Sequence, residues 1–198
     1  KAVEKGNSNA MNNLGVLYKN EHKDLQKAED WYLKAAENGH SNAMNNLGVL
    51  YKFEHKNLQK AEEWYLKAAE KGNLDAMNNL GWLYKSEHKD LQKAEEWYLK
   101  AAEKGNSAAM NDLAWLYEDD HKDPQKAEEW YLKAAENGEP IAMNNLGRLY
   151  KNEHKDLQKA EGWYLKAAEK GNSNAMNNLG WLYKNEHKDL QKAEDWYL

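Results

Sequence analysis

The sequence has no cysteine, only two prolines and a single phenylalanine among its 198 residues. Without cysteine there are no disulfides, no thiolate nucleophiles and no thiolate metal ligands. Apolar runs are short as well, and none approaches the roughly 18 residues that a membrane-spanning helix needs. Basic residues are not in excess, because the formal net charge is -5. A nucleic-acid binder would show a basic patch or stripe, so we expect neither nucleic acid as a partner nor membrane insertion.

Aromatic residues, by contrast, are abundant and periodic. Nine tryptophans and twelve tyrosines are present, and most of them recur every 33 residues, as the methionines do. The methionines are Met11, Met44, Met77, Met110, Met143 and Met176. Six repeats of this length account for residues 1–198 without a linker or a tail. Self-similarity at such a period is the signature of a stacked-repeat protein, so we predict a single repeat domain over residues 1–198.

Each repeat contains two apolar patterns at helical spacing. Met11 and Tyr18 lie on the apolar face of the first pattern, and Tyr32 lies on that of the second. We call these the A helix and the B helix, and we expect them at about residues 8–20 and 25–38. One such hairpin cannot bury its apolar face alone, whereas stacked hairpins complete a common core. The pattern therefore predicts an all-α solenoid of six helix–turn–helix repeats.

Proline and glycine indicate where the helices begin and end. We call a set of equivalent positions in the repeats a register, and we name it by its residue in the first repeat. Pro124 and Pro140 fit the first position of a helix, where the missing N–H is not needed. Asp123 and the Asn7 register are then the N-terminal caps of the B and A helices. The Gly39 register follows the B helix, where a left-handed residue ends a helix.

Two further registers concern the core. Gly15 lies in the middle of the A helix, and the fourth repeat has Ala114 in its place. We therefore expect that this position needs a small side chain for close helix contact, rather than a positive φ. Aromatic pairs recur at Trp31 and Tyr32, and rings of this size bury large areas. We predict that both of these registers are core.

The family resemblance rests on two motifs. They are Leu14-Gly15-x-x-Tyr18 and Lys27-Ala28-x-x-Trp31-Tyr32-x-Lys34-Ala35-Ala36-Glu37-x-Gly39. In these motifs each unit resembles a Sel1-like repeat, a relative of the tetratricopeptide repeats. The loop from Asn20 to Asp24 lacks the glycine that such repeats usually have, which predicts a tighter turn. The resemblance implies an α/α superhelix whose A helices line the inner surface, and it implies adaptor or scaffold roles.

The sequence indicates neither a metal site nor a catalytic site. The His22 register supplies one histidine per repeat, but equivalent positions in stacked repeats lie about 10 Å apart and cannot share one metal ion. We expect these histidines to be solvated near the end of the A helix. Acidic and basic residues recur at identical registers, whereas catalysis needs one asymmetric cluster. We therefore predict a protein that is not an enzyme and that has no cofactor and no metal site.

Paired asparagines follow the A helix on the side expected to face the groove. The set comprises Asn12, Asn13, Asn45, Asn46, Asn78, Asn79, Asn111, Asp112, Asn144, Asn145, Asn177 and Asn178. Asparagine is a poor residue inside a helix, so its recurrence needs a reason. One interpretation is a ladder of amides that holds a peptide backbone or sugar hydroxyls. The other is that the Asn13 register bonds to the adjacent loop and the Asn12 register is simply solvated.

The Val16 register varies although its surroundings hardly change. Its residues are Val16, Val49, Trp82, Trp115, Arg148 and Trp181. Tryptophan and arginine are typical anchors of binding sites. The alternative is that the position tolerates many residues because it is partly exposed, or that its tryptophans pack between repeats. Together with the asparagines, Trp82, Trp115, Arg148 and Trp181 form the predicted partner-binding groove.

Three functions are consistent with these patterns. The first is a scaffold whose groove binds a protein or peptide partner. The second is a self-assembling module, because both ends of the sequence fall inside a B helix and uncapped solenoids expose apolar end faces that can stack end to end. The third is a glycan-binding groove lined by tryptophan and asparagine. Light scattering separates the second from the others, and peptide and glycan arrays separate the first from the third.

Overall fold

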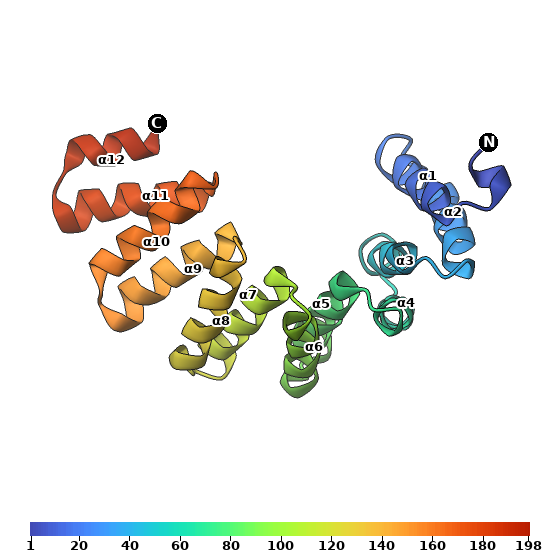
Figure 1. The fold of residues 1–198 in the computed structure, drawn as a ribbon, viewed down its shortest axis with the longest axis horizontal. Coiled ribbons are helices and arrows are strands. Elements are labelled where there is room, and N and C mark those ends of the chain that lie inside the picture. Colours follow the sequence, from blue (N-terminus) through green and yellow to red (C-terminus); the bar gives the residue numbers. More distant parts are fainter. The chain divides into compact units, whose positions relative to one another are not determined.

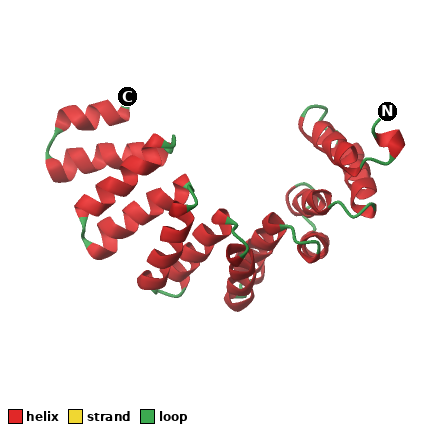
Figure 2. Ribbon diagram, viewed as in Figure 1, coloured by secondary structure: helices red, strands yellow, loops and turns green.

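The computed structural model describes residues 1–198, which form two compact units, residues 1–104 and 105–198. Twelve α-helices and no strands are present. In Figure 2 the chain is accordingly drawn in the colours of helix and loop alone. The prediction of an all-α solenoid of helix–turn–helix repeats is confirmed. No helix combines the length and the apolar character that are required to cross a membrane.

The first unit contains three hairpins, which Figure 1 labels by helix. Its elements are η1 (Val3–Lys5), α1 (Ser8–Asn20), α2 (Leu25–Glu37), α3 (Ser41–Phe53), α4 (Leu58–Glu70), α5 (Leu74–Leu83), η2 (Tyr84–His88) and α6 (Leu91–Glu103). The second unit repeats the plan. Its elements are α7 (Ser107–Trp115), η3 (Leu116–Asp120), α8 (Pro124–Glu136), α9 (Pro140–Leu149), η4 (Tyr150–His154), α10 (Leu157–Glu169), α11 (Ser173–Leu182), η5 (Tyr183–His187) and α12 (Leu190–Tyr197).

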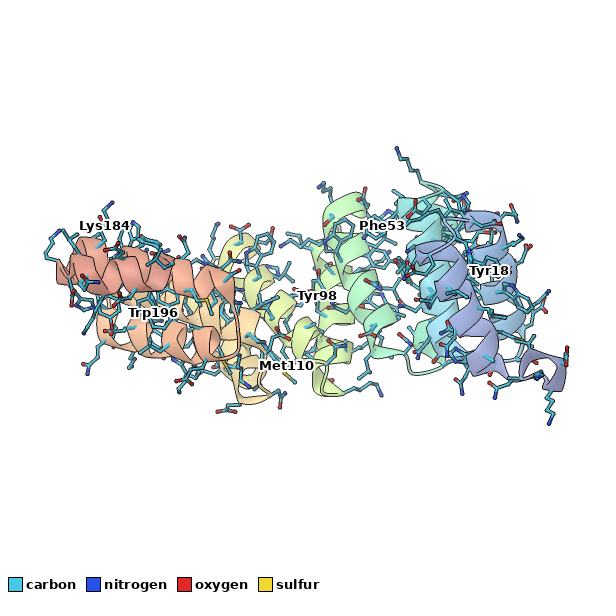
Figure 3. All side chains as sticks on the ribbon, turned by 90° about the horizontal axis from the view of Figure 1, so that it is seen from above. Tyr18, Phe53, Tyr98, Met110, Lys184 and Trp196 are labelled. Carbon is cyan, nitrogen blue, oxygen red and sulfur yellow. The ribbon has the colours of Figure 1, made fainter.

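Odd-numbered helices are the A helices of the repeats and even-numbered helices are the B helices. Within each unit, an A helix packs on the B helix of its own repeat, and that B helix packs on the next A helix. This alternation buries one stripe of every helix, as stacking of repeats requires. Figure 3 shows the side chains on this framework, with Tyr18 on α1 and Phe53 at the end of α3.

The helix boundaries follow the predicted signals. The side chain of Asn7 accepts a hydrogen bond from the Ala10 N–H at 2.9 Å, and Asp24 accepts one from the Lys27 N–H at 3.0 Å. Pro124 and Pro140 occupy the first positions of α8 and α9. The Gly39 register has φ values between 75° and 92° in all repeats. Capping side chains and left-handed glycines satisfy backbone groups that a helix end leaves open.

The turn between the A and B helices is made by lysine rather than glycine. In repeats three to six, the A helix ends in a five-residue π-helical turn, η2 to η5. In the turn that follows, the Lys23 register has φ values between 51° and 57° in all six repeats. A left-handed conformation costs a residue with a Cβ roughly 1–2 kcal/mol. The turn is therefore compact, and it carries a small strain in every repeat.

The core is built on a contact between glycine and tyrosine. A Cβ placed on Gly15 would collide with the ring of Tyr32, and the same holds for Gly48 with Tyr65. None of these mid-helix glycines has a positive φ, so the predicted need for a small side chain is confirmed. The Tyr32 register is at most 2% exposed in the first five repeats.

The Trp31 register is not core, and the prediction for it was wrong. Each of its tryptophans is half-buried, whereas the tyrosine beside it is buried in the first five repeats. Neighbouring residues on a helix point about 100° apart, so one narrow stripe cannot bury both rings. The tyrosine ring packs against the Gly15 register of the A helix. The indole lies beside the buried stripe of the B helix, where it is partly exposed. There Lys34 places its Nζ 4.3 Å from the centre of the Trp31 ring.

Candidate functional site

In each compact unit, the candidate site is the face of the A helices that carries the Asn12, Asn13, Val16 and Lys19 registers, which we call the A-face. These positions are three or four residues apart on each helix and therefore lie on neighbouring turns. Trp82 and Trp181 are each 38% exposed, and Trp115 is 43% exposed. The structure thus places the predicted indoles at the surface.

Asparagines of successive repeats bond to one another along the A-face. In four of the six repeats, the Asn13-register amide donates to the Oδ1 atom of the Asn12 register in the preceding repeat. The bonds are Asn46 to Asn12 at 2.9 Å, Asn79 to Asn45 at 2.9 Å, Asn145 to Asn111 at 3.0 Å and Asn178 to Asn144 at 2.8 Å. The sequence interpretation had considered a ligand or the adjacent loop as partners, but not the next repeat. Part of the ladder therefore stabilises the stacking of repeats.

The ladder does not exhaust the hydrogen-bonding capacity of the amides. A side-chain amide offers two N–H donors and one oxygen with two lone pairs. The bond from Asn46 to Asn12 uses one donor of Asn46 and one lone pair of Asn12. Most of these asparagines are partly exposed, although Asn144 is buried. A fixed row of partly satisfied amides can still bind a polar backbone.

The Val16 register pairs with the Lys19 register of the preceding repeat. Lys52 places its Nζ 3.0 Å from the centre of the Trp82 ring, and Lys151 places its Nζ 3.8 Å from that of Trp181. These are cation–π contacts, which are worth about 0.5 to 2 kcal/mol each. One ring face of each indole is thereby covered, and its orientation is fixed while the rest stays accessible.

The fourth repeat replaces this pair with a different one. Glu118 stands where the other repeats have lysine. Its Oε2 atom accepts hydrogen bonds from Arg148 Nη2 at 2.7 Å and from the hydroxyl of Tyr131 at 2.9 Å. The Glu118 side chain is 14% exposed and that of Arg148 is 35% exposed. Arg148, which the sequence predicts to be a binding residue of the groove, therefore also forms an ion pair within the fold.

Burial and neighbouring charges shift the pKa values of the basic residues in these pairs. Desolvation lowers the pKa of Lys52 to about 8, and Glu87 counteracts this only in part. Burial also acts against the charge of Arg148, but its ion pair with Glu118 is stronger, so the pKa of Arg148 is raised. The Lys52 ammonium is thus buried beside an aromatic ring, and its desolvation costs free energy. The charge of the Arg148 guanidinium, in contrast, is compensated by the Glu118 carboxylate.

The predicted histidine row is not simply solvated. In four repeats the histidine lies beside a glutamate of the preceding repeat, with Nε2 to Oε2 distances from 3.2 to 3.4 Å. The pairs are His55 with Glu29, His88 with Glu62, His154 with Glu128 and His187 with Glu161. The same glutamate accepts a hydrogen bond from a tyrosine hydroxyl. The donors are Tyr51, Tyr84, Tyr150 and Tyr183. These clusters link neighbouring repeats.

The tyrosines of these clusters have raised pKa values. Desolvation and the glutamate together raise the pKa of Tyr51, Tyr84 and Tyr150 to about 12. For Tyr183 the hydrogen bond to Glu161 is the larger cause, with the same result of about 12. At neutral pH all four hydroxyls are therefore donors. The row holds the repeats together, and no three of its histidine or carboxylate groups converge as metal ligands would.

Shallow hollows lie at equivalent places along the edge of the A-face. One in the first unit, of about 400 Å³, is lined by Lys19, Asn20, Lys23, Leu25 and Glu54. One in the second unit, of about 310 Å³, is lined by Lys151, Asn152, Lys155, Leu157, Trp181 and Glu186. A third, of about 260 Å³ and also in the second unit, is lined by Trp115, Glu118, Asp119, Lys122, Pro124, Arg148 and Glu153. Each is formed by the end of one A helix, the turn after it and the next A helix.

Sequence reasoning missed the Lys19 register, which contains Lys52 and Glu118. A signal was present, because the one carboxylate of this register, Glu118, precedes the one cation of the Val16 register, Arg148, by 30 residues. Paired replacements of this kind indicate spatial contact. The offset of 30 residues, however, is known only once the stacking of the repeats is known.

Comparisons with known proteins agree with this repeat structure. A family model for the Sel1 repeat matches residues 8–40, 41–73, 74–106, 107–139, 140–172 and 173–198. The crystal structure of a Sel1 repeat protein from Oxalobacter formigenes is 31% identical, with a TM-score of 0.80, over 100% of this chain and 86% of that chain. A comparison with curated proteins gave no match.

Two further solved structures are similar. A protective antigen of uropathogenic Escherichia coli strains, which displays an SLR fold, is 28% identical with a TM-score of 0.51, over 99% of this chain and 54% of that chain. An immunity protein from Pseudomonas aeruginosa is 24% identical with a TM-score of 0.65, over 96% of this chain and 80% of that chain. The latter likeness shows the fold alone.

Proposed function

Because the chain belongs to the Sel1 repeat family, we propose that it is a non-enzymatic scaffold that binds a protein or peptide partner along its A-face. Repeat proteins of this family mediate protein–protein interactions. The observation that carries the proposal is the exposure of Trp82 in the first unit and of Trp115, Arg148 and Trp181 in the second, at one register of repeats that otherwise hardly differ. Rigid aromatic rings supply contact area at a low cost in conformational entropy.

The asparagine ladder supports a peptide as the partner. An extended peptide presents alternating N–H and C=O groups, and side-chain amides can bind both. Because the ladder is bonded from repeat to repeat, its amides are held in place before a partner arrives. Such preorganisation lowers the entropy cost of binding. The indoles would then provide affinity, and the amides would fix the backbone.

The test uses the full chain and a library of random 12-residue peptides. Peptides selected on the wild type are measured by fluorescence anisotropy against Trp181→Ala and against Trp163→Ala. Trp163 is a half-buried tryptophan on the B helix α10, under Lys166, and so it is a matched control. We expect Trp181→Ala to weaken binding by about tenfold or more, as loss of an anchor does, and Trp163→Ala to have little effect. Equal effects, with helicity retained, would exclude the A-face.

Glycan binding by the same face stays the alternative ligand class. Tryptophan rings and amides also suit sugar rings and hydroxyls. A glycan array with the wild type and Trp181→Ala decides between them. Binding to glycans that is lost in the variant, together with no selected peptides, would replace the peptide proposal.

A further inference from the structure

Two hollows in the second unit occupy the same registers but differ in charge. The hollow of the fifth repeat has two ammonium groups, Lys151 and Lys155, and one carboxylate, Glu186. The hollow of the fourth repeat has three carboxylates, Glu118, Asp119 and Glu153, against two cations, Lys122 and Arg148. The formal balance is positive in the first case and negative in the second. The first unit repeats the positive type, with Lys19 and Lys23 against Glu54.

The difference comes from replacements in one repeat. Glu118 replaces lysine, and Asp119 stands where the fifth repeat has Asn152. Arg148 compensates Glu118 at 2.7 Å, and Lys122 lies 3.7 Å from Asp119. The carboxylate of Glu153, which also lines the fourth-repeat hollow, carries the remaining negative charge. Each hollow also borders an exposed indole, Trp115 or Trp181.

We propose that the second unit recognises an extended peptide that places a basic side chain in the fourth-repeat hollow and an acidic side chain in the fifth-repeat hollow. This inference rests on the proposed function. Charge complementarity selects the side chains, and the indoles contact their aliphatic stems. Equivalent points of stacked repeats lie about 10 Å apart, and an extended chain advances about 3.3 Å per residue. The two charged residues are therefore three positions apart.

The asparagine ladder on the same A helices fits the same occupant. The bonded pairs Asn145 with Asn111 and Asn178 with Asn144 lie about one helical turn before the Val16 register on the A helices. Asn145 and Asn178, which are partly exposed, each use one amide N–H in these bonds and keep a second. A peptide backbone there would receive donors and acceptors at the spacing of the repeats, whereas a folded surface would have to supply them from several segments.

The experiment inverts the charge of one hollow by giving it the residues that the other hollow already has. The variant Glu118→Lys, Asp119→Asn, Arg148→Trp copies Lys151, Asn152 and Trp181. Its reciprocal, Lys151→Glu, Asn152→Asp, Trp181→Arg, copies the fourth repeat. Both combinations exist in the wild type, so the variants should keep its helicity, which circular dichroism checks. The control Glu129→Lys, on an exposed part of α8, changes the net charge by the same amount as the first variant.

Random 12-residue peptides are selected on each full-length variant and then measured by fluorescence anisotropy. Wild-type peptides should carry a basic and an acidic residue three positions apart. The first variant should bind these peptides about tenfold more weakly and select two acidic residues instead, whereas the reciprocal variant should select two basic ones. Glu129→Lys should retain the wild-type preference.

The outcomes separate the two levels of the proposal. Peptides that bind without a paired-charge preference, or whose preference is unchanged in the first variant, overturn the charge inference and leave the proposed function intact. A shift in Glu129→Lys equal to that in the first variant also overturns it, because net charge would then be the cause. No peptide binding at all overturns the proposed function itself.

Discussion

The junction between repeats two and three, in the first unit, and the junction between repeats four and five, in the second, are built on the same registers with different chemistry. In the first, Lys52 lies on the ring of Trp82 and is 9% exposed. In the second, Glu118 binds both Arg148 and Tyr131. The backbone elements are equivalent, so the difference lies in the side chains alone. A stacked-repeat framework can therefore exchange an aromatic–cation contact for an ion pair without a change in fold.

The equivalent B-helix tyrosines of repeats two and four show how the two junctions differ in hydrogen bonding and therefore in free energy. Tyr65 is fully buried, and its hydroxyl has no hydrogen-bond partner. The equivalent Tyr131 donates its hydroxyl to Glu118. Desolvation raises the pKa of both tyrosines, and Glu118 raises that of Tyr131 further. The second junction thus satisfies a polar group that the first leaves buried and unpaired, which costs free energy.

The largest effect is expected from Arg148→Met. This change leaves Glu118 mostly buried without its counter-charge, and loss of one partner of a buried pair costs about 3 kcal/mol. The matched change in the other junction, Trp82→Met, removes an indole that is 38% exposed and should cost about 1 kcal/mol. Urea denaturation followed by circular dichroism gives both values.

A rescue variant sharpens this prediction. Glu118→Lys combined with Arg148→Trp converts the second junction to the type of the first, and it should recover most of the stability lost in Arg148→Met. If the single and the double variants are equally unstable, the loss does not come from the unpaired Glu118 carboxylate.

The next effect concerns the two tyrosine hydroxyls. Tyr131→Phe removes a hydrogen bond to a carboxylate, which is worth about 1.5–3 kcal/mol. Tyr65→Phe removes a buried hydroxyl without a partner, and it should be neutral or slightly stabilising. Thermal unfolding of the two variants measures the contrast, and equal losses would show that the Glu118 contact is not important in solution.

A pH-dependent effect is expected only in the first junction. The pKa of Lys52 is lowered to about 8 in the folded chain, against about 10.5 when unfolded. Below pH 8 both states bind the proton and the full cost of burial is present. Between the two pKa values the unfolded state binds more protons, so stability rises with pH. Lys52→Met removes that cost, of the order of 3 kcal/mol, but also the cation–π contact of up to about 2 kcal/mol.

We therefore expect Lys52→Met to be more stable than the wild type by about 1 kcal/mol at pH 7. This advantage should disappear near pH 9 and reverse above it, because the wild type gains about 1.4 kcal/mol per pH unit between the two pKa values. The measurement is the difference in the free energy of unfolding at several pH values, because deprotonation of the tyrosines affects both proteins alike. A difference that is constant with pH would show that Lys52 titrates normally. Arg148→Met supplies the control, since Arg148 does not titrate in this range.

The smallest effect should be the same in both junctions. Lys56 and Lys122 make the interhelical turns of repeats two and four with φ values of 51° and 54°. Glycine adopts this conformation without the strain of a Cβ, although it adds entropy to the unfolded chain. We expect Lys56→Gly and Lys122→Gly to stabilise by about 0.5 kcal/mol each. Unequal shifts in melting temperature would show that the turns, and not only the side chains, distinguish the junctions.

Much of the fold could be predicted from the sequence because its signals are local. The caps at Asn7 and Asp24, the prolines and the small residue at Gly15 each act within one repeat or one hairpin. Local propensity also predicted two aromatic registers as core, but it could not tell Tyr32 from Trp31. That choice depends on which ring lies above the glycine of the neighbouring helix.

By itself, then, the sequence determined the period, the helices and the exposed Val16 register. Only the tertiary structure decided which side chains meet across repeats. Asn46 bonds to Asn12 over 34 residues, and Lys52 meets Trp82 over 30. The physical reason is that both offsets depend on how far one hairpin is shifted and rotated against the next. That geometry is set by packing of the whole core, and no local pattern encodes it.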